Sequence, residues 1–422
     1  MASKHRSALS IVFVTVFIDL LGFGIVLPLL PRYGEYFHAE GPVLGLLMAS
    51  FSAMQFIFSP IWGRLSDRVG RRPILIFGLA GSTTSYAVFG LASSLAPGDR
   101  LAGLSPLTWL FITRIGAGIA GATISTAQAV IADVTTPLER GRGMAMIGAA
   151  FGIGFTFGPL VGAVCVSSDP SSAPSPAAGY MASVLSGLAL LSAVFLLPET
   201  LRPASTTTGG WFLLTNLKAA VARPVIGLIL ACTFFTTFAF TQFESTLALL
   251  TKELGLADKN NFLVFAYIGL VLTLSQGLLV RRLVPTVGEF RLSLVGTALM
   301  AIGLVGIGLS ALEQSRPFLY AVIPVCVVGF SAVTPSLQSL LSRRSDASEQ
   351  GGILGVGQAV SAVARILGPV VGLSLFAKSA TWPYWGGAAV MAFSVLLVFS
   401  LRSAPPLDDV PPVQPQEAVI EG

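Results

Sequence analysis

The sequence predicts an all-α membrane protein in which 12 transmembrane helices form two six-helix, pseudo-symmetric bundles. Its apolar segments repeatedly reach the roughly 20 residues that a helix needs to cross a lipid bilayer. Of its 422 residues 54% are hydrophobic and only 11% are charged, whereas soluble domains carry about 25% charged residues. Motifs of the first half also recur in the second half. Together these observations exclude a soluble protein.

Clusters of charged and turn residues divide the chain into the apolar segments that we expect to span the membrane. The twelve segments cover residues 8–30, 42–62, 73–95, 106–131, 143–166, 178–197, 224–250, 261–280, 290–311, 317–341, 351–376 and 381–401. Glycine and proline inside them are compatible with membrane helices, because neighbouring helices satisfy the freed backbone groups and small residues permit close packing. The first segment is too long for the apolar region of a signal peptide, so we interpret it as a retained helix.

The positive charges are distributed unequally over the two sides of the membrane that this division creates. Of the 25 Lys and Arg residues, 17 fall on the side of the N-terminus and 6 on the other side, while Arg114 and Arg365 lie within spans. Because cytoplasmic loops carry the excess of Lys and Arg, we expect both termini in the cytoplasm. The short connector between the halves favours a bacterial inner membrane.

Short motifs around the fifth predicted span recur 210 residues later. Glu139-Arg-Gly141 returns as Glu349-Gln-Gly351, Gly158-Pro159 returns as Gly368-Pro369, and the segment that begins at Gly63 has a looser copy from Gly277 to Arg282. Such repeats indicate two similarly folded halves. We therefore expect an N-terminal six-helix bundle (1–197), a cytoplasmic connector (198–223), a C-terminal six-helix bundle (224–402) and a disordered, Pro-rich and acidic cytoplasmic tail (403–422).

Five charges are concentrated between the second and third predicted spans. They belong to the segment Gly63-Arg-Leu-Ser-Asp67-Arg68-Val-Gly70-Arg71-Arg72-Pro73. This segment resembles the signature loop of the major facilitator superfamily, and the repeat layout agrees with that family over almost the whole chain. The resemblance implies the two-bundle major facilitator fold and a cytoplasmic latch that stabilises the state open to the outside.

The residue types of this loop have physical reasons. Gly63 allows helices two and eleven to approach each other, and Asp67 is suited to a helix N-terminus, where the macrodipole favours an anion. The arginines can bridge to an acid such as Asp133 at the end of the fourth span. The alternative is that basic residues such as Arg64 and Arg72 extend to anionic lipid. The expected latch consists of Gly63, Asp67, Arg68, Gly70, Arg71 and Asp133.

The fifth predicted span contains the motif Gly154-x-x-x-Gly158-Pro159-x-x-Gly162. It resembles the antiporter signature of drug:proton exporters within the superfamily. The glycines allow close contact with a neighbouring helix, and Pro159 leaves one backbone carbonyl without its usual donor, which bends the span. The alternative interpretation is packing of small residues without any role in the direction of transport.

The first and fourth predicted spans each contain a charged residue at membrane depth. A charged, unpaired carboxylate such as that of Asp19 costs at least about 3 kcal/mol there. The run from Asp19 to Pro31 resembles the first helix of bacterial tetracycline exporters. Arg114 matches the fourth-span arginine of the superfamily, to which proton coupling is ascribed. We expect Asp19 and Arg114 to interact across the cavity of the first half; the alternative is a static polar contact between helices.

In the second half, Glu244 and Arg365 lie within the seventh and eleventh predicted spans. Gln242-Phe-Glu244 and Ala364-Arg365 resemble the animal tetracycline-transporter-like proteins. If the two helices are neighbours, as that fold implies, Glu244 can neutralise Arg365. Alternatively, the planar guanidinium of Arg365 is free to bind a carboxylate of an anionic substrate. A further alternative is that Glu244 lies in interfacial water. Candidate cavity residues by type and depth are also Gln128, Gln338 and Gln358.

The chain departs from the tetracycline exporters at two acidic positions. Ser85 replaces the acid of their third span, and the ninth span has no acid before Glu313 at its outer end. The loss of two acids beside a retained Arg365 shifts the expected cargo from a metal-chelated cation toward an amphiphile or an organic anion.

We therefore expect a monomeric secondary active transporter in the lipid bilayer that exports a small amphiphilic compound in exchange for protons. A proton-independent facilitator or importer of an organic anion is the alternative within the fold, and a non-transporting receptor or scaffold is the alternative outside it. The sequence has no Ser/His/Asp set, metal-ligand cluster or phosphate loop, so we expect neither an enzyme nor a metal or cofactor. We also expect no nucleic-acid partner.

Overall fold

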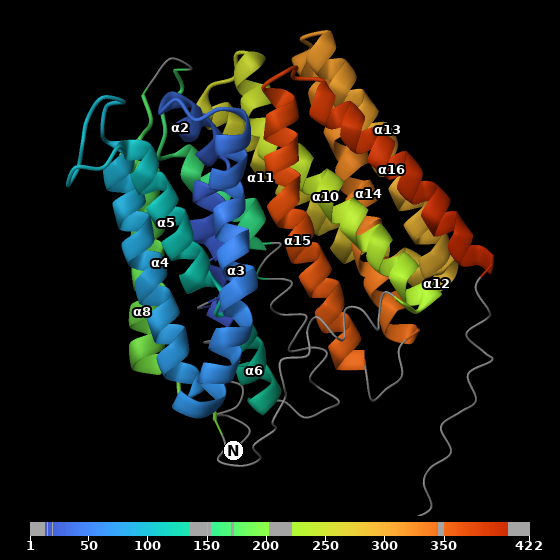
Figure 1. Cartoon of the computed structure of the whole chain (residues 1–422), viewed down its shortest axis with the longest axis horizontal. Coiled ribbons are helices and arrows are strands. Elements are labelled where there is room, and N and C mark those ends of the chain that lie inside the picture. The colour runs from blue at the N-terminus through green and yellow to red at the C-terminus, as the bar shows by residue number, and fades with distance from the viewer. Residues whose placement is uncertain are drawn as a thin grey trace, which may run out of the picture.

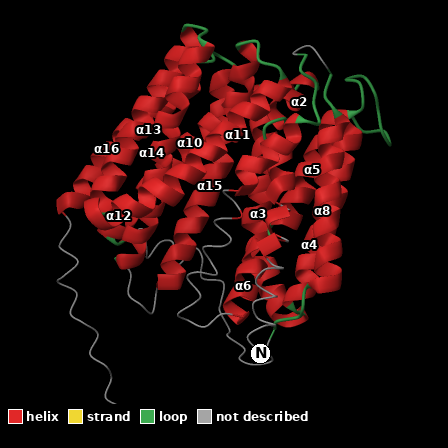
Figure 2. Cartoon of the chain, turned by 180° about the vertical axis from the view of Figure 1, so that it is seen from behind, coloured by secondary structure: helices red, strands yellow, loops and turns green. Residues whose placement is uncertain are grey.

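The computed structural model describes residues 13–14, 16–18, 20–134, 150, 153–169, 173–201, 222–344 and 350–403. Within these residues the chain is helical apart from its connections (Figure 2). Eleven of the described helices are long and apolar enough to cross a membrane, and the shorter apolar helix Ile153–Ala163 stands at the fifth predicted span. The predicted all-α fold class is confirmed. The expected tail lies outside the described residues except for its first position, residue 403.

The first half contains a helical stretch over residues 20–26 and then α2 (Leu30–Tyr36), α3 (Gly41–Val69), α4 (Arg71–Ser93), α5 (Pro106–Gly121), α6 (Ile124–Val134), the helix Ile153–Ala163 and α8 (Pro176–Leu196). The second half contains α10 (Pro224–Glu253), α11 (Asp258–Leu274), the π-helix η1 (Ser275–Val280), α12 (Arg281–Val287), α13 (Glu289–Leu312), α14 (Arg316–Arg343), α15 (Gln350–Phe376), α16 (Trp382–Ser400) and the short η2 (Leu401–Ser403). The eighth span therefore continues beyond its expected end at residue 280, through η1 into α12.

Local sequence explains where the spans break or begin. Pro28 and Pro31 have no N–H to donate, so the first span is interrupted by the turn 27–29 before α2 resumes. Ser105 begins α5, and its side chain accepts a hydrogen bond from the backbone N–H of Thr108. Such caps satisfy backbone donors that the first helical turn leaves open.

The two ends of the molecule differ in how the halves meet. We call the end at which α3 ends and α4 begins the proximal face, and the end that carries α2 the distal face (Figure 1). On the distal side one apolar core contains residues of both halves, including Leu30 and Phe262. On the proximal side each half has a separate core, around Leu79 in the first half and around Leu341 in the second half. Within the described part of the chain, the halves therefore share a core distally and have separate cores proximally.

Missing side chains permit the close distal contact between the halves. A Cβ on Gly45 of α3 would lie 2.5 Å from the Cα of Val370 on α15. A Cβ on Gly162 would overlap the ring of Phe262, which α11 contributes from the other half. Two helix pairs, α3 with α15 and the fifth span with α11, therefore form the seam between the halves.

Candidate functional site

Arg114 is buried in the first half, at the centre of α5. Its side chain is 2% exposed, and its guanidinium lies over the rings of Phe51 at 4.5 Å and Phe23 at 5.8 Å. The atoms Nε and Nη1 have no hydrogen-bond partner among the described residues. Asp19, its expected partner, lies outside the described residues, so that pairing stays a prediction. The two aromatic faces stabilise this charge, because cation–π contacts strengthen on desolvation.

Glu244 and Arg365 come from two helices that pack against each other in the second half, α10 and α15. Gly368 of α15 leaves space for Thr241 of α10, whose hydroxyl lies 3.4 Å from the carbonyl of Ala364. This contact brings Glu244 and Arg365 close enough to interact electrostatically, but no ion pair within 4.0 Å joins them in the described structure. Both side chains are partly exposed. The neutralising salt bridge that one interpretation required is therefore not formed in this conformation.

The three candidate glutamines, Gln128, Gln338 and Gln358, lie exposed on the proximal side. By helix rise they stand roughly 8–12 Å from the proximal ends of α6, α14 and α15, whereas Arg365 stands roughly 22 Å from the start of α15. They belong to the proximal third of the molecule rather than to the level of Arg365.

The loop between α3 and α4 is organised around Arg71, which is 8% exposed. Its Nη1 lies 2.5 Å from Asp67 and its Nε lies 3.1 Å from Asp133, so the expected bridge to Asp133 is present. The expected position of Asp67 is wrong. Asp67 lies in the last turn of α3, where the helix dipole disfavours an anion, and it is stabilised by Arg71. Arg68 is exposed.

Sequence reasoning missed Glu199, which follows α8 and caps the start of α4. Its carboxylate accepts hydrogen bonds from the backbone N–H groups of Arg71 and Arg72 at 2.9 and 3.1 Å, in the space that Gly70 leaves open. Burial alone would raise the pKa of Glu199, but the backbone donors of Leu201, Arg71, Arg72 and Thr200 outweigh it and lower this pKa. The sequence signal for this helix cap is the acidic residue that directly follows Pro198 at the end of the sixth span.

The corresponding turn of the second half is at Gly288, which follows the segment Gly277 to Arg282 that the sequence matches to the segment beginning at Gly63. Gly70 and Gly288 begin α4 and α13 with φ/ψ of 114/154° and 82/153°. Next to Gly288, Glu289 lies 3.2 Å from Arg343 at the end of α14. In both halves an ion pair joins the first residue of one helix, α4 or α13, to the end of another, α6 or α14. The first half carries the base on the former helix, whereas the second half carries the acid there.

The glycines of the antiporter-like motif contact two different partners. Gly154 and Gly158 pack against the first span, where a Cβ on Gly158 would lie 2.8 Å from the Cα of Gly24. Pro159 lies within the helix Ile153–Ala163 and also faces Gly24. Gly162 instead faces Phe262 of the other half. The motif therefore positions the fifth span between the first span and α11.

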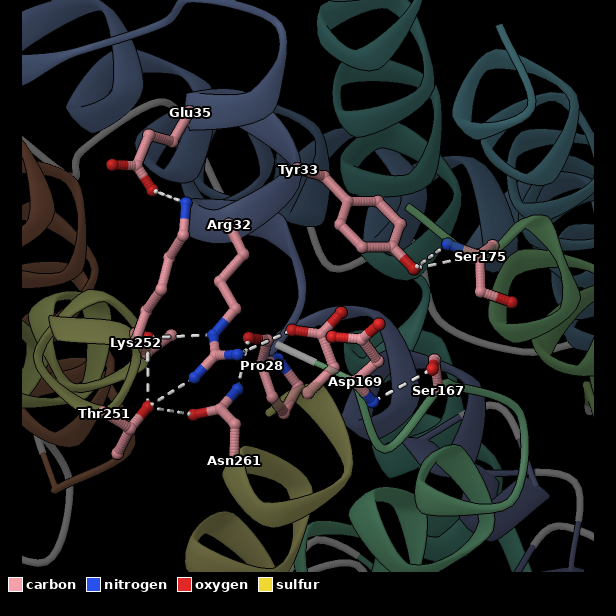
Figure 3. Close-up of polar contacts among 12 residues, drawn as sticks. Pro28, Arg32, Tyr33, Glu35, Ser167, Asp169, Ser175, Thr251, Lys252 and Asn261 are labelled. Atoms are coloured by element: carbon pink, nitrogen blue, oxygen red, sulfur yellow. Dashed lines mark hydrogen bonds and ion pairs between the residues drawn. The ribbon is translucent and has the colours of Figure 1, made fainter. Parts of the chain in front are cut away.

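A polar network joins the halves at the distal face (Figure 3). Arg32 of α2 donates from Nε to the carbonyl of Ala248 at 3.0 Å, from Nη1 to Asp258 at 2.6 Å and from Nη2 to Thr251 at 2.9 Å. Asn261 donates to the carbonyl of Pro28 at 2.9 Å. Sequence reasoning counted Arg32 only as a charge outside the spans, because its partners lie more than 200 residues away.

A second distal ion pair and a mid-span contact complete the links between the halves that the described residues show. Lys252 lies 2.7 Å from Glu35. The hydroxyls of Thr156 and Thr273 are 3.2 Å apart, at the level where the fifth span crosses α11. Among the described residues no group of three or more His, Cys, Asp or Glu side chains could hold a metal ion.

In the described residues, two halves of apolar helices share a distal core, have separate proximal cores and carry charged side chains within their spans, which is the architecture of a membrane transporter. The family model "Major Facilitator Superfamily" matches residues 12–369, and the chain belongs to this superfamily.

Relatives support this assignment over nearly the full length. The chain is 31% identical to tetracycline resistance protein class E of Escherichia coli, over 92% of this chain and 93% of the relative. It is 30% identical to human major facilitator superfamily domain-containing protein 10, over 93% of each. The crystal structure of the human organic anion transporter MFSD10 (TETRAN) covers 93% of this chain and 99% of that one, with a TM-score of 0.66 and 26% identity.

Proposed function

We propose that the protein is a secondary active exporter that moves small amphiphilic organic anions out of the cell in exchange for protons. The relatives support the drug-like, anionic cargo, because some are described as tetracycline resistance proteins and one as an organic anion transporter. The proton exchange rests on the charged residues Asp19 and Arg114 within the spans. The excess of positive charge at the proximal side favours a cytoplasmic location of that face. The conformation with separate proximal cores is then the one that takes up cargo from the cytoplasm.

The observation that carries the choice of an anionic cargo is the arrangement of Arg365. This arginine lies at membrane depth, is partly exposed, and has no direct ion pair with Glu244. A charged side chain at this depth costs about 2.5–3.5 kcal/mol or more, so an unpaired one is retained for a function. Its planar fork suits a carboxylate. We assign cargo recognition to Arg365, and proton transfer to Asp19 together with Arg114. The carboxylate of Glu244 competes with the cargo for Arg365.

Transport in vesicles tests the proposal. Everted vesicles that expose the proximal face should accumulate fluorescein, an amphiphilic organic anion, when the lumen is more acidic than the medium. Arg365→Gln should reduce this accumulation at least tenfold, because the bidentate contact to the anion is lost. Asp19→Asn should leave exchange of fluorescein intact but abolish its dependence on the pH gradient.

The matched probe is rhodamine 6G, an amphiphilic cation of similar size. Accumulation of rhodamine 6G but not of fluorescein refutes the anionic cargo. Movement of fluorescein that ignores an imposed pH gradient refutes proton exchange and identifies a facilitator. Full gradient-driven accumulation by Asp19→Asn refutes the assignment of the proton to Asp19.

A further inference from the structure

We propose that Arg32 is the lock of a distal gate: its contacts with α10 and α11 hold the distal side closed, and opening to that side requires their rupture. The inference rests on the proposed transport by alternating access. Arg32 is in this sense a positioning residue, because it acts on the conformational step and not on the cargo. Arg32, Ala248, Thr251 and Asp258 constitute the lock.

The lock consists of three hydrogen bonds from a buried side chain. All three nitrogen atoms of the Arg32 guanidinium group are occupied, each by a different acceptor of the second half. The side chain is 5% exposed, so water does not compete for these bonds. Charge-assisted bonds to a buried guanidinium are the strong ones among protein hydrogen bonds.

The broken first span supplies the geometry of the lock. Because Pro28 and Pro31 interrupt the helix, α2 begins again at Leu30 and presents Arg32 toward the α10–α11 turn. The same break frees the carbonyl of Pro28 to accept from Asn261. Asn261 also accepts from the hydroxyl of Thr251 at 2.8 Å. The network therefore divides between the two halves of the molecule: Pro28 and Arg32 belong to the first half, and their partners belong to the second half.

The neighbouring ion pair between Lys252 and Glu35 provides an internal control. It joins the same helices, but its side chains are 44% and 38% exposed. Exposed ion pairs contribute little, because water and salt screen them. The lock should therefore depend on Arg32 and not on Lys252.

Cysteine accessibility tests the proposal without reference to cargo. Cys165, Cys232 and Cys326 are first replaced by Ser or Ala, and Leu30→Cys, at a fully buried distal position, or Gln128→Cys, at an exposed proximal position, is introduced as the reporter. A charged maleimide should label the distal reporter at least tenfold faster in Arg32→Gln. It should label the proximal reporter more slowly, because the equilibrium moves toward the state with the proximal side closed. Lys252→Gln should change either rate less than twofold.

Two further variants separate the lock from simple loosening of the fold. Arg32→Lys keeps the charge but cannot reach three acceptors at once, so it should behave like Arg32→Gln. Asp258→Asn should give an intermediate effect. Unchanged labelling in folded Arg32→Gln overturns the proposal, and so does faster labelling at both reporters, which indicates local unfolding. These rates are independent of whether fluorescein or a proton moves, so failure of the proposed function is recognised separately.

Discussion

The clearest mechanical prediction concerns two glycines on the same helix, Gly45 and Gly63 of α3. In the present conformation Gly45 lies against the backbone of α15, whereas, of the described atoms, a Cβ on Gly63 would approach the hydroxyl of Ser125 alone, at 3.8 Å. Gly63 is also the position at which the sequence predicts a close approach of helices two and eleven, and the resemblance of its loop implies a latch that stabilises the state open to the outside. Alanine at Gly45 should therefore disfavour the distally closed state, and alanine at Gly63 should favour it.

The expected magnitude follows from the space at Gly45. Its Cβ would lie 2.5 Å from the Cα of Val370 and 3.0 Å from the carbonyl oxygen of Pro369, both backbone atoms, where ordinary contacts begin at 3.4 Å. The helices would have to separate by nearly 1 Å. Insertion of one methyl group into a packed site that cannot yield costs about 1–3 kcal/mol. A cost of that size changes the ratio of the two states by about 5- to 150-fold.

Distance measurements between spin labels provide the assay. Double electron–electron resonance on the exposed distal pair Glu40→Cys and Glu313→Cys should show a longer distance gaining population in Gly45→Ala. The exposed proximal pair Val69→Cys and Arg282→Cys should show the reverse, a shorter distance gaining population. Gly63→Ala should shift both distributions in the opposite direction. Equal distributions in wild type and Gly45→Ala, at unchanged thermal stability, would refute the argument that the seam controls the equilibrium.

Two further predictions concern the turn at Gly70. Glu199→Gln should lower the melting temperature by about 2–4 °C near neutral pH, the equivalent of about 1 kcal/mol for a helix cap. The folded-state pKa of Glu199 is lowered. The stabilisation by Glu199 is therefore full above the unfolded pKa of about 4.3 and is lost as the pH falls through the folded-state pKa. A difference in melting temperature between wild type and Glu199→Gln that persists at lower pH contradicts the assignment. Arg71→Gln should cost about 2 kcal/mol, since it removes the buried guanidinium that pairs with Asp133 and leaves the buried hydroxyl of Ser66 without its donor. Arg68→Gln should stay within about 0.5 kcal/mol because Arg68 is exposed. Equal losses in chemical unfolding of the two variants would argue against Arg71 as the centre of the turn.

The spans were predictable because a bilayer prescribes the length and composition of each helix. The role of Gly158 in close packing followed from its missing side chain, and the bridge from Arg71 to Asp133 followed from opposite charges at two helix ends that face the same side. These inferences need only the local sequence and the order of the helices.

The lock at Arg32 was not predictable in the same way. Its partners, such as Asp258, are separated from it by more than 200 residues, and no sequence pattern near Arg32 predicts these contacts. The position of Asp67 was wrong because α3 continues to Val69, seven residues beyond the expected end of the second span. Polar residues can continue a helix beyond the apolar segment that crosses the membrane, and the hydrophobicity of the sequence does not show where such a helix ends.

The exchanged charges at Gly70 and Gly288 have a consequence for the symmetry of the molecule. The two turns occupy corresponding places in the two halves, and a strict repeat would put arginine at the start of both α4 and α13. Instead Arg71 begins one helix and Glu289 begins the other, and each keeps an ion pair with the end of the span that follows its own. Opposite charges therefore close both turns, although the two halves no longer carry the same charge at corresponding positions.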